Sequence, residues 1–516
     1  MDKEILKFCV DKGLLLDKDL LNLFCEEKNL DSIKLILEKI QTHTNKRVIT
    51  RDVFFKNRKR VSEAFNALPE EHQKKLEKLK IKLGLSIEIS KEVSIEKEKI
   101  SEISPGPVRV MSVNCSLGKK FVVGDFVTHF RNRFSEMRGF LQSHAALENL
   151  VSINKISGVR QGISIVGMVY DKKVTKNKNI IFEVEDFTGK IKILVNKDKA
   201  ELFEKAEDVA LDSVVGFKCS GTKEILFANE IIFPETKLFE RKKAPVEEYV
   251  AFIGDLHYGS KKFMKDNFLK FIDYLNGKFS NSFEAKKIKY LFILGDLITG
   301  VGNYPNQERD LEIVDLEEQY KQIAELLGRI RKDIKIIISP GNHEGVRLME
   351  PQPLYNQKYA WPLYDLENVI LIENPSLVNI ASTKDFPGFN VLVYHGFSYP
   401  YYSNNVSRLM KIKAMNSPEK IMLYLLQHRH LAPTHGSVQY FPCEKDSHII
   451  RNVPDIFASG HTHKGALVYS NNILVVSCST WEEMTPYQEK FGNTPDHCKV
   501  PILNLKTRAV KILDFE

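Results

Sequence analysis

Cysteine is scarce in this 516-residue chain, and its spacing matches no familiar motif. The seven cysteines lie at positions 9, 25, 115, 219, 443, 478 and 498, and no two of them form a C-x-x-C pair. An odd, scattered set argues against a disulfide framework and against a zinc ribbon. The fold must therefore depend on apolar cores, for which a hydrophobic content of 43% is ample.

Long apolar runs are also missing. No stretch reaches the roughly 20 residues that a membrane-spanning helix needs. The N-terminal sequence MDKEILKFCVDKG lacks the pattern of a signal peptide. We therefore expect a cytoplasmic protein without a membrane contact, with about three domains for a chain of this length. The net charge of +8 is compatible with a polyanionic partner but is weak evidence for one.

The N-terminal half changes composition twice. In residues 1–82 apolar side chains recur at helical spacing, which predicts a small helical domain that either docks another protein or forms a simple capping bundle. Residues 83–107 are rich in Ser, Glu and Lys and end in Pro-Gly-Pro, so we predict a flexible linker, with a single amphipathic strand as the alternative.

Residues 108–240 contain short β-rich runs separated by turn residues, with a helix expected at His129–Leu150. The pattern resembles an OB-fold β-barrel. Such a barrel binds single-stranded nucleic acid or serves as a protein interface, and both remain open. The candidate basic residues for nucleic acid are Lys172, Lys173, Lys176, Lys178, Lys190 and Lys192.

The C-terminal half holds a set of metal-type side chains, each placed just after an apolar run that reads as a buried strand. They are Asp255, His257, Asp296, Asn342, His395, His461 and His463. Open α/β sheets place their sites at the carboxyl ends of strands. A mixed set of carboxylate, amide and imidazole suits Mn²⁺, Fe or Zn²⁺ better than a pure Ca²⁺ or Mg²⁺ cage. The set is typical of a two-metal hydrolase.

Local spacing adds detail to this prediction. Asp255 and His257 are two residues apart, as are His461 and His463, and would point the same way if the strands continued. Neighbouring glycines would let the backbone approach a metal closely. An apolar stripe from Glu312 to Arg331 predicts an amphipathic helix, and together with the strands this indicates a sheet with helices on its faces.

These motifs, in the order DxH, GD, GNHE, H and GHTH, resemble the calcineurin-like metallophosphoesterases between Val250 and Tyr469. The segments GDLHYGSKKF, GNHEGVRLMEPQPL, HRHLAPTHGS and TWEEMTPYQEKFG are similar to a narrower family, the small subunits of archaeal DNA polymerase D. The EPQP and HLAP segments are not required by metal chemistry. The resemblance implies a multidomain α+β protein whose residues 241–516 form a calcineurin-like α/β sandwich.

The resemblance also implies roles for the site residues. Asp255, His257 and His463 would bind one divalent metal, Asn342, His395 and His461 a second, and Asp296 would bridge them. Mn²⁺ is the favoured ion, with Fe, Zn²⁺ and Mg²⁺ as alternatives. His343 would contact the phosphate or protonate the leaving group, a task that suits imidazole. Its acidic partner in many phosphatases is missing here, because the segment reads GDLITG.

The implied activity is a 3′→5′ proofreading exonuclease on single-stranded or mismatched DNA 3′ ends. The implied partners are a large catalytic subunit in a heterodimer, DNA and, through the complex, the sliding clamp. The chain shows no three-acid polymerase signature of its own. Two alternatives stay open: a non-catalytic structural subunit of a polymerase, and a stand-alone nucleotide phosphodiesterase.

Contacts to DNA near the metals are predicted from two loops. The sequence after His395 is rich in aromatic residues, so Tyr399, Tyr401 and Tyr402 are candidates for base stacking, with a packed loop core as the alternative. Arg347, shortly after GNHE, is predicted to contact phosphate or to anchor its loop.

Overall fold

The computed structural model describes residues 2–17, 20–21, 24, 30–44, 48–49, 68–69, 72, 108–111, 120–142, 144–279, 283–485, 488–489, 492 and 494–516. The chain divides into two compact units, Met1–Ser104 and Pro105–Glu516. The predicted linker at 83–107 lies outside the described residues. Within the described ranges, no helix is long and apolar enough to cross a membrane.

The first unit contains the helices α1 (Asp2–Asp11) and α3 (Leu30–Thr44). Their apolar faces meet in a small core that includes the fully buried Ile5 and Leu37. The predicted helical character is confirmed for these two segments. A short parallel pair, β1 (Leu15–Leu16) with β2 (Val48–Ile49), was not predicted.

Five strands of the second unit close into a barrel in the order β4-β5-β6-β8-β7. They are β4 (Gln161–Val174), β5 (Ile180–Asp186), β6 (Gly189–Val195), β7 (Val214–Gly221) and β8 (Leu226–Ile232), with α9 (Ala200–Asp208) after β6. β5 and β6 form an antiparallel hairpin, as the turn residues between these β-rich runs indicate. Its turn is closed by Asp186 Oδ1, which accepts hydrogen bonds from the amides of Thr188 and Gly189 at 2.7 and 3.1 Å.

The segment before the barrel differs from its prediction in two respects. The helix α8 spans Val123–Gln142 and so begins earlier and ends earlier than expected. The strand β3 (Val108–Met111) was placed with the barrel, but it pairs with β13 (Ser376–Ile380) of the C-terminal region. The sequence could not show this, because the partner strand lies more than 260 residues away.

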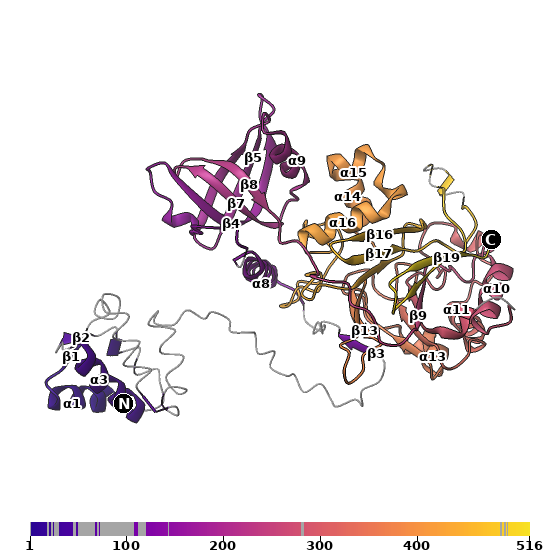
Figure 1. Cartoon of the computed structure of the whole chain (residues 1–516), viewed down its shortest axis with the longest axis horizontal. Coiled ribbons are helices and arrows are strands. Elements are labelled where there is room, and N and C mark those ends of the chain that lie inside the picture. The colour runs from indigo at the N-terminus through magenta and orange to yellow at the C-terminus, as the bar shows by residue number, and fades with distance from the viewer. Residues whose placement is uncertain are drawn as a thin grey trace. The chain divides into compact units, whose positions relative to one another are not determined.

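Two six-stranded sheets form the C-terminal region (Figure 1). The first has the order β12-β11-β10-β9-β18-β19, and the second β16-β17-β15-β14-β13-β3. In chain order the strands not yet given are β9 (Tyr249–Ile253), β10 (Ile288–Leu294), β11 (Lys335–Ser339), β12 (Val369–Leu371), β14 (Phe389–Val393), β15 (Ile456–Ser459), β16 (Ala466–Ser470), β17 (Ile473–Ser477), β18 (Lys499–Asn504) and β19 (Val510–Asp514).

An apolar core fills the space between the two sheets, with Phe252 and Phe292 from the first packed near Val391 and Val393 from the second. Helices cover the outer faces. The first sheet packs on α10 (Lys265–Leu275), α11 (Phe283–Lys287), α12 (Leu316–Gly328) and α13 (Gln357–Tyr364), and the second on α14 (Tyr399–Asn405), α15 (Ser407–Lys411) and α16 (Pro418–His428). This mixed α/β sandwich agrees with the predicted C-terminal fold.

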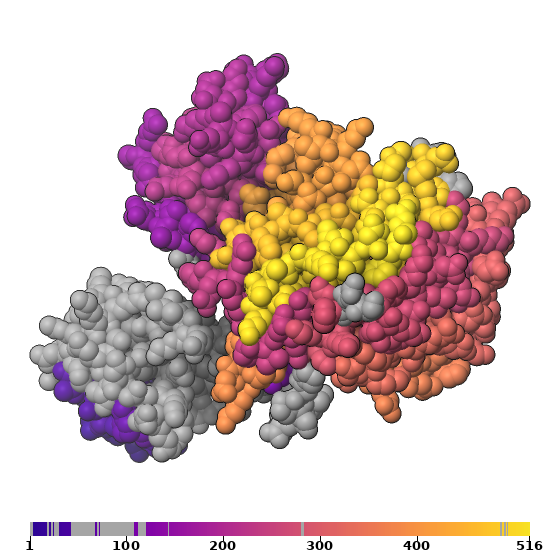
Figure 2. Space-filling model, turned by 45° about the vertical axis from the view of Figure 1, so that its right-hand side comes forward, coloured from indigo at the N-terminus to yellow at the C-terminus, as the bar shows by residue number. Residues whose placement is uncertain are grey.

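The barrel contacts the helices on the second sheet, as the space-filling view also shows in magenta and orange (Figure 2). Arg408 of α15 forms an ion pair with Asp208 at the end of α9, with 2.8 Å between Nη2 and Oδ2. The amide of His435 donates to Asp212 Oδ2 at 2.8 Å.

Among the cysteines that the structure describes, all but one follow the sequence expectation. Cys9, Cys219, Cys478 and Cys498 are buried and free. Cys443 is disulfide-bonded, which its isolated position in the sequence did not predict.

Candidate metal centre

All seven predicted ligands lie beyond the carboxyl ends of strands in the middle of the two sheets. Asp255 and His257 follow β9, Asp296 follows β10, and Asn342 follows β11 of the first sheet; His395 follows β14, and His461 and His463 follow β15 of the second. Because the two sheets face each other, these loops meet at one edge of the sandwich. The sequence prediction that the ligands come together is consistent with this placement.

The local backbone differs from the prediction. Strand conformation does not continue through the ligand pairs: φ is +49° at Asp255 and +50° at His257, and likewise positive at Asp296, His461 and His463. Non-glycine residues rarely adopt this left-handed conformation, which costs about 1–3 kcal/mol each and persists only where the surroundings enforce it. The condition behind the i, i+2 argument, a continued extended backbone, is therefore not met, although Asp255 and His257 still reach the same cluster of ligand atoms.

Glycine makes one of these approaches sterically possible. A Cβ atom on Gly341 would lie 2.3 Å from Asp296 Oδ1 and 2.8 Å from His395 Cε1. No side chain fits there, so the loop between β11 and the GNHE motif can lie against the central carboxylate only with glycine at this position.

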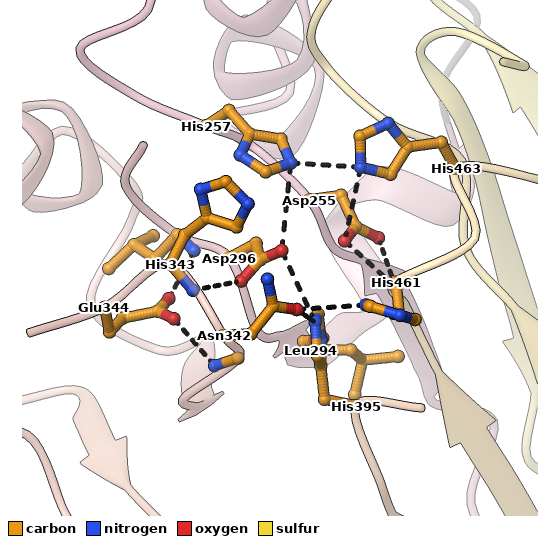
Figure 3. A network of polar contacts seen from close by, with 12 residues as sticks. Asp255, His257, Leu294, Asp296, Asn342, His343, Glu344, His395, His461 and His463 are labelled. Carbon is orange, nitrogen blue, oxygen red and sulfur yellow. Dashed lines mark hydrogen bonds and ion pairs between the residues drawn. The ribbon is translucent and has the colours of Figure 1, made fainter. Parts of the chain in front are cut away.

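The ligand atoms form clusters around Asp296 (Figure 3). In one cluster, Nε2 of His257 and Nε2 of His463 are 3.0 Å apart, and His463 Nε2 lies 3.7 Å from Asp255 Oδ1. In the other, Asn342 Oδ1 lies 3.0 Å from both His395 Nε2 and His461 Nδ1. Asp296 Oδ2 is 3.9 Å from His257 Nε2 and 3.4 Å from His395 Nε2, so it faces both clusters.

Burial and the charges of neighbouring side chains set the protonation states of the predicted ligands. Burial raises the pKa of Asp255 well above its usual range, with a contribution from Asp296. Burial also opposes ionisation of Asp296, but His395 and His343 outweigh it and hold its pKa well below the usual range. Burial lowers the pKa of His461 to about 3 and that of His463 to about 4, so both imidazoles are neutral at pH 7.

The arrangement fits divalent cations on the evidence of its donor set. His395 Nδ1 donates to the Leu294 carbonyl at 2.9 Å, which leaves the Nε2 lone pair of a neutral imidazole facing the acceptor oxygens of Asn342 and Asp296. Lone pairs directed at one another repel unless a cation or proton lies between them. Burial opposes a charge on His395, yet the two aspartates raise its pKa to about 10, so positive charge is strongly favoured at this point.

His343 lies beside the clusters with one ring nitrogen engaged. Its amide donates to Asp296 Oδ1 at 2.9 Å, and its Nδ1 donates to the Thr299 carbonyl at 2.9 Å. Asn303 Nδ2 donates to the same carbonyl at 2.9 Å. The partner that the sequence left unknown is thus a backbone carbonyl, and Nε2 remains available. His343 also lies close enough to His257 and Asp296 to form a third possible metal cluster.

Glu344 was not predicted to contribute, although it is the last residue of the GNHE motif. Its side chain is buried, and its two oxygens accept hydrogen bonds from the amides of Leu297 and Gly341 at 2.6 and 2.7 Å. It therefore joins the loop of Asp296 to the loop of Asn342. The acidic residue directly after Asn342 and His343 was the sequence feature that could have indicated this structural role of Glu344.

The aromatic loop after His395 packs inward. Tyr399 and Tyr402 are fully buried, and their hydroxyls donate to Ser459 Oγ at 2.7 Å and Ser437 Oγ at 3.2 Å. A buried ring has no free face for a base, so stacking is wrong for these two residues, and the packed-loop alternative holds. Tyr401 is half-buried against Tyr402. Phe397, also half-buried, lies 5.7 Å from the His461 ring.

Two basic candidates have structural partners. Arg347 donates to the carbonyls of Met349 and Pro351 at 3.3 and 2.7 Å and covers the Phe441 ring, which fits a loop anchor. Lys172 of the barrel is half-buried, and its amine donates to the carbonyls of Glu207 and Val209, which argues against a role as a surface contact for DNA.

Comparison with known proteins places this geometry in a family. The calcineurin-like phosphoesterase family matches residues 249–465, a stretch that begins at β9 and contains all seven predicted ligands. The DNA polymerase II small subunit of Methanothermobacter thermautotrophicus is 35% identical over 76% of this chain and 80% of its own length. That of Pyrococcus furiosus is 36% identical over 79% of this chain and 66% of its own length.

The chain belongs to the DNA polymerase II small subunit family. The resemblance drawn from the motifs is thereby confirmed, including its narrower part. This DNA polymerase II small subunit homologue carries a C-terminal calcineurin-like phosphoesterase domain, and that domain holds buried His/Asp clusters of the kind found in two-metal phosphoesterases.

Proposed function

We propose that this protein is the small subunit of an archaeal replicative DNA polymerase and carries a two-metal 3′→5′ exonuclease that removes single-stranded or mismatched 3′ ends. The observation that supports the proposal is the pair of ligand clusters that lie on either side of Asp296 at one edge of the sandwich. A non-catalytic structural subunit would have no need for five residues held in left-handed backbone around buried carboxylates.

In the proposed site, Asp255, His257 and His463 would hold one divalent ion and Asn342, His395 and His461 the other, with the Asp296 carboxylate facing both. Mn²⁺ suits this ligand set, with Fe, Zn²⁺ and Mg²⁺ as alternatives. When bound, the two ions supply an activated water and neutralise the charge that develops on the phosphate.

The chain's own residues supply orientation and a proton. Thr299 and Asn303 hold His343 so that Nε2 faces the clusters, where it can donate to a phosphate oxygen or to the leaving 3′ oxygen. Glu344 holds the loop of Asp296 and the loop of Asn342 together, because its carboxylate accepts an amide hydrogen bond from each. The half-buried Phe397, whose ring lies 5.7 Å from that of the predicted ligand His461, is a candidate for base stacking in place of Tyr399 and Tyr402.

We further propose that the five-stranded barrel is an OB-fold and that residues 83–107 link it to an N-terminal docking domain at 1–82. The names of the relatives support a large polymerase subunit as the partner. DNA would reach the phosphoesterase as a 3′ end presented by that subunit. The engaged side chain of Lys172 favours a protein interface over a DNA groove on its side of the barrel.

Metal dependence is the direct test of this function. After chelation and dialysis the protein should not degrade a single-stranded oligonucleotide labelled at its 5′ end, and Mn²⁺ should restore a ladder that shortens from the 3′ end. An oligonucleotide with a blocked 3′ end is the control for polarity. Full activity in metal-free protein would contradict the two-metal site, and shortening from the 5′ end would contradict only the polarity.

The division of labour between domains predicts the effect of a truncation. Deletion of residues 1–107 should leave nuclease activity within about 2-fold of the full chain, because β3 at Val108 and all site residues remain. The truncated chain should also still form a complex with the large subunit in size-exclusion chromatography. A chain that keeps its activity but no longer binds would place the main interface in the N-terminal domain.

A further inference from the structure

A buried chain of charged and polar groups connects α8 to the metal centre. On α8, Arg133 donates through Nε to Asp446 Oδ2 at 2.6 Å and through Nη1 to the Pro433 carbonyl at 2.8 Å. Both the Arg133 and the Asp446 side chains are nearly inaccessible, at 2% and 1% exposure. Because isolated charges are costly inside a protein, such a pair is retained only when both groups are fully engaged.

The chain continues through the HLAP and EPQP segments. Asp446 also contacts His430 Nε2 at 3.0 Å and receives the His448 amide at 3.0 Å. His448 Nε2 in turn lies 2.6 Å from Glu350 Oε2. Burial opposes a charge on His448, but Asp446 and Glu350 raise its pKa to about 9, so basic and acidic groups alternate along the chain.

From Glu350 the contacts reach the loop of the predicted ligand His395. Tyr394 Oη donates to Glu350 Oε2 at 3.3 Å and accepts the Ser398 amide at 3.2 Å. Ser398 Oγ donates to the Leu431 carbonyl at 2.8 Å. The loop of residues 394–398 is therefore held at both ends by groups that the metal chemistry does not use.

The same EPQP segment also reaches the other ligand loop. Gln352 Nε2 donates to the Gly341 carbonyl at 2.8 Å, and Asn374 joins Gln352 to the His395 amide with hydrogen bonds of 2.7 and 2.9 Å. Residues that contact the ligands of a metal, but not the metal itself, orient those ligands. Their substitution commonly lowers metal affinity or activity by about 10–100-fold.

We infer that Arg133 and Glu350 are positioning residues of the phosphoesterase site, which hold the 394–398 loop in place from the docked helix α8. The inference rests on the proposed function, because it assigns these residues to the geometry of that site. In this view the EPQP and HLAP segments connect α8 to the 394–398 loop. The position of the predicted ligand His395 then depends on a helix outside the sandwich.

The test compares Arg133→Met and Glu350→Gln with a matched control. Arg451→Met removes another ion pair to α8, Arg451 Nε to Glu136 Oε1 at 2.6 Å, which lies outside the chain of contacts. In the metal-free full-length protein, hydrogen exchange of residues 394–398 should accelerate about 10-fold in both network variants and stay unchanged in the control. With Mn²⁺ and a chromogenic phosphodiester, kcat should fall roughly 10-fold with KM within 2-fold.

Failure of the positioning role and failure of the proposed function would give different results. Equal exchange in all four proteins, or the same acceleration in Arg451→Met, would overturn the positioning role. A parent protein without phosphodiesterase activity would overturn the proposed function, while the exchange measurement would still decide the link between α8 and the loop. If Arg133→Met fails to fold because Asp446 is left unpaired, the nearly isosteric Glu350→Gln decides the outcome.

Discussion

Replacement of Asp296 by alanine should eliminate both metal ions and reduce DNA hydrolysis by more than about 10³-fold. Loss of a single electrostatic group in an active site typically costs about 10²–10³-fold, and this carboxylate faces both clusters. Its Oδ2 lies within 4 Å of His257 and His395, and its Oδ1 receives the His343 amide. Elemental analysis of the purified protein, together with the rate on a single-stranded oligonucleotide, measures the effect.

Two further variants make this result specific. Asp296→Asn keeps the volume and the hydrogen bond to His343 but removes the charge, so it should lose metal nearly as completely. Asp310→Ala removes an exposed carboxylate that accepts from Tyr304 farther along the same loop, and it should keep full metal content and activity. Two bound ions in Asp296→Ala would show that the clusters are independent and that the bridge is not needed.

Replacement of His343 by alanine should leave both metals in place and lower kcat by roughly 10²–10⁴-fold, the usual contribution of a general acid. The physical reason is that Nδ1 donates to the Thr299 carbonyl, so Nε2 is the nitrogen left to donate a proton to the substrate. In this variant kcat should therefore fall while the metal content stays unchanged, whereas in Asp296→Ala both should fall. A substrate with a 4-nitrophenyl leaving group, which needs little protonation, should show a much smaller loss.

The control for His343 is His144→Ala, which removes an exposed histidine before the barrel and should change neither quantity. Loss of one metal ion in His343→Ala would assign this residue to the cluster with His257 and Asp296. It would then be a ligand, and the source of the leaving-group proton would have to be sought elsewhere in the loops.

The strands that carry the ligands could be predicted from sequence because each is a short apolar run buried on both faces. The runs before Asp255, Asp296, Asn342 and His395 became β9, β10, β11 and β14. The helix expected at 312–331 became α12, Leu316–Gly328, with Asp315 as its N-cap accepting from the Glu318 amide at 2.8 Å. In these segments local pattern and tertiary structure agree.

The geometry of the ligands could not be predicted, because it depends on contacts between distant loops. The left-handed backbone at Asp255 is held by the other strand ends: its carboxylate accepts the His461 amide, and its own amide donates to the Gly295 carbonyl. The sequence pattern also gave the wrong role for Tyr399 and Tyr402, which were candidates for base stacking but are buried. A run of aromatics in a loop reads equally as a binding surface or as a core, and only burial separates the two.

The sandwich is closed by strands from both ends of the second unit. β3 at Val108–Met111 completes the second sheet, and β18 at Lys499–Asn504 pairs with β9, the strand that leads to Asp255. During synthesis β9 would thus leave the ribosome roughly 250 residues before its neighbour, with an unpaired edge exposed in the meantime. A chain that lacks β18 would still hold every predicted ligand, but one edge of β9 would be unpaired and the proposed site would lose support beneath Asp255.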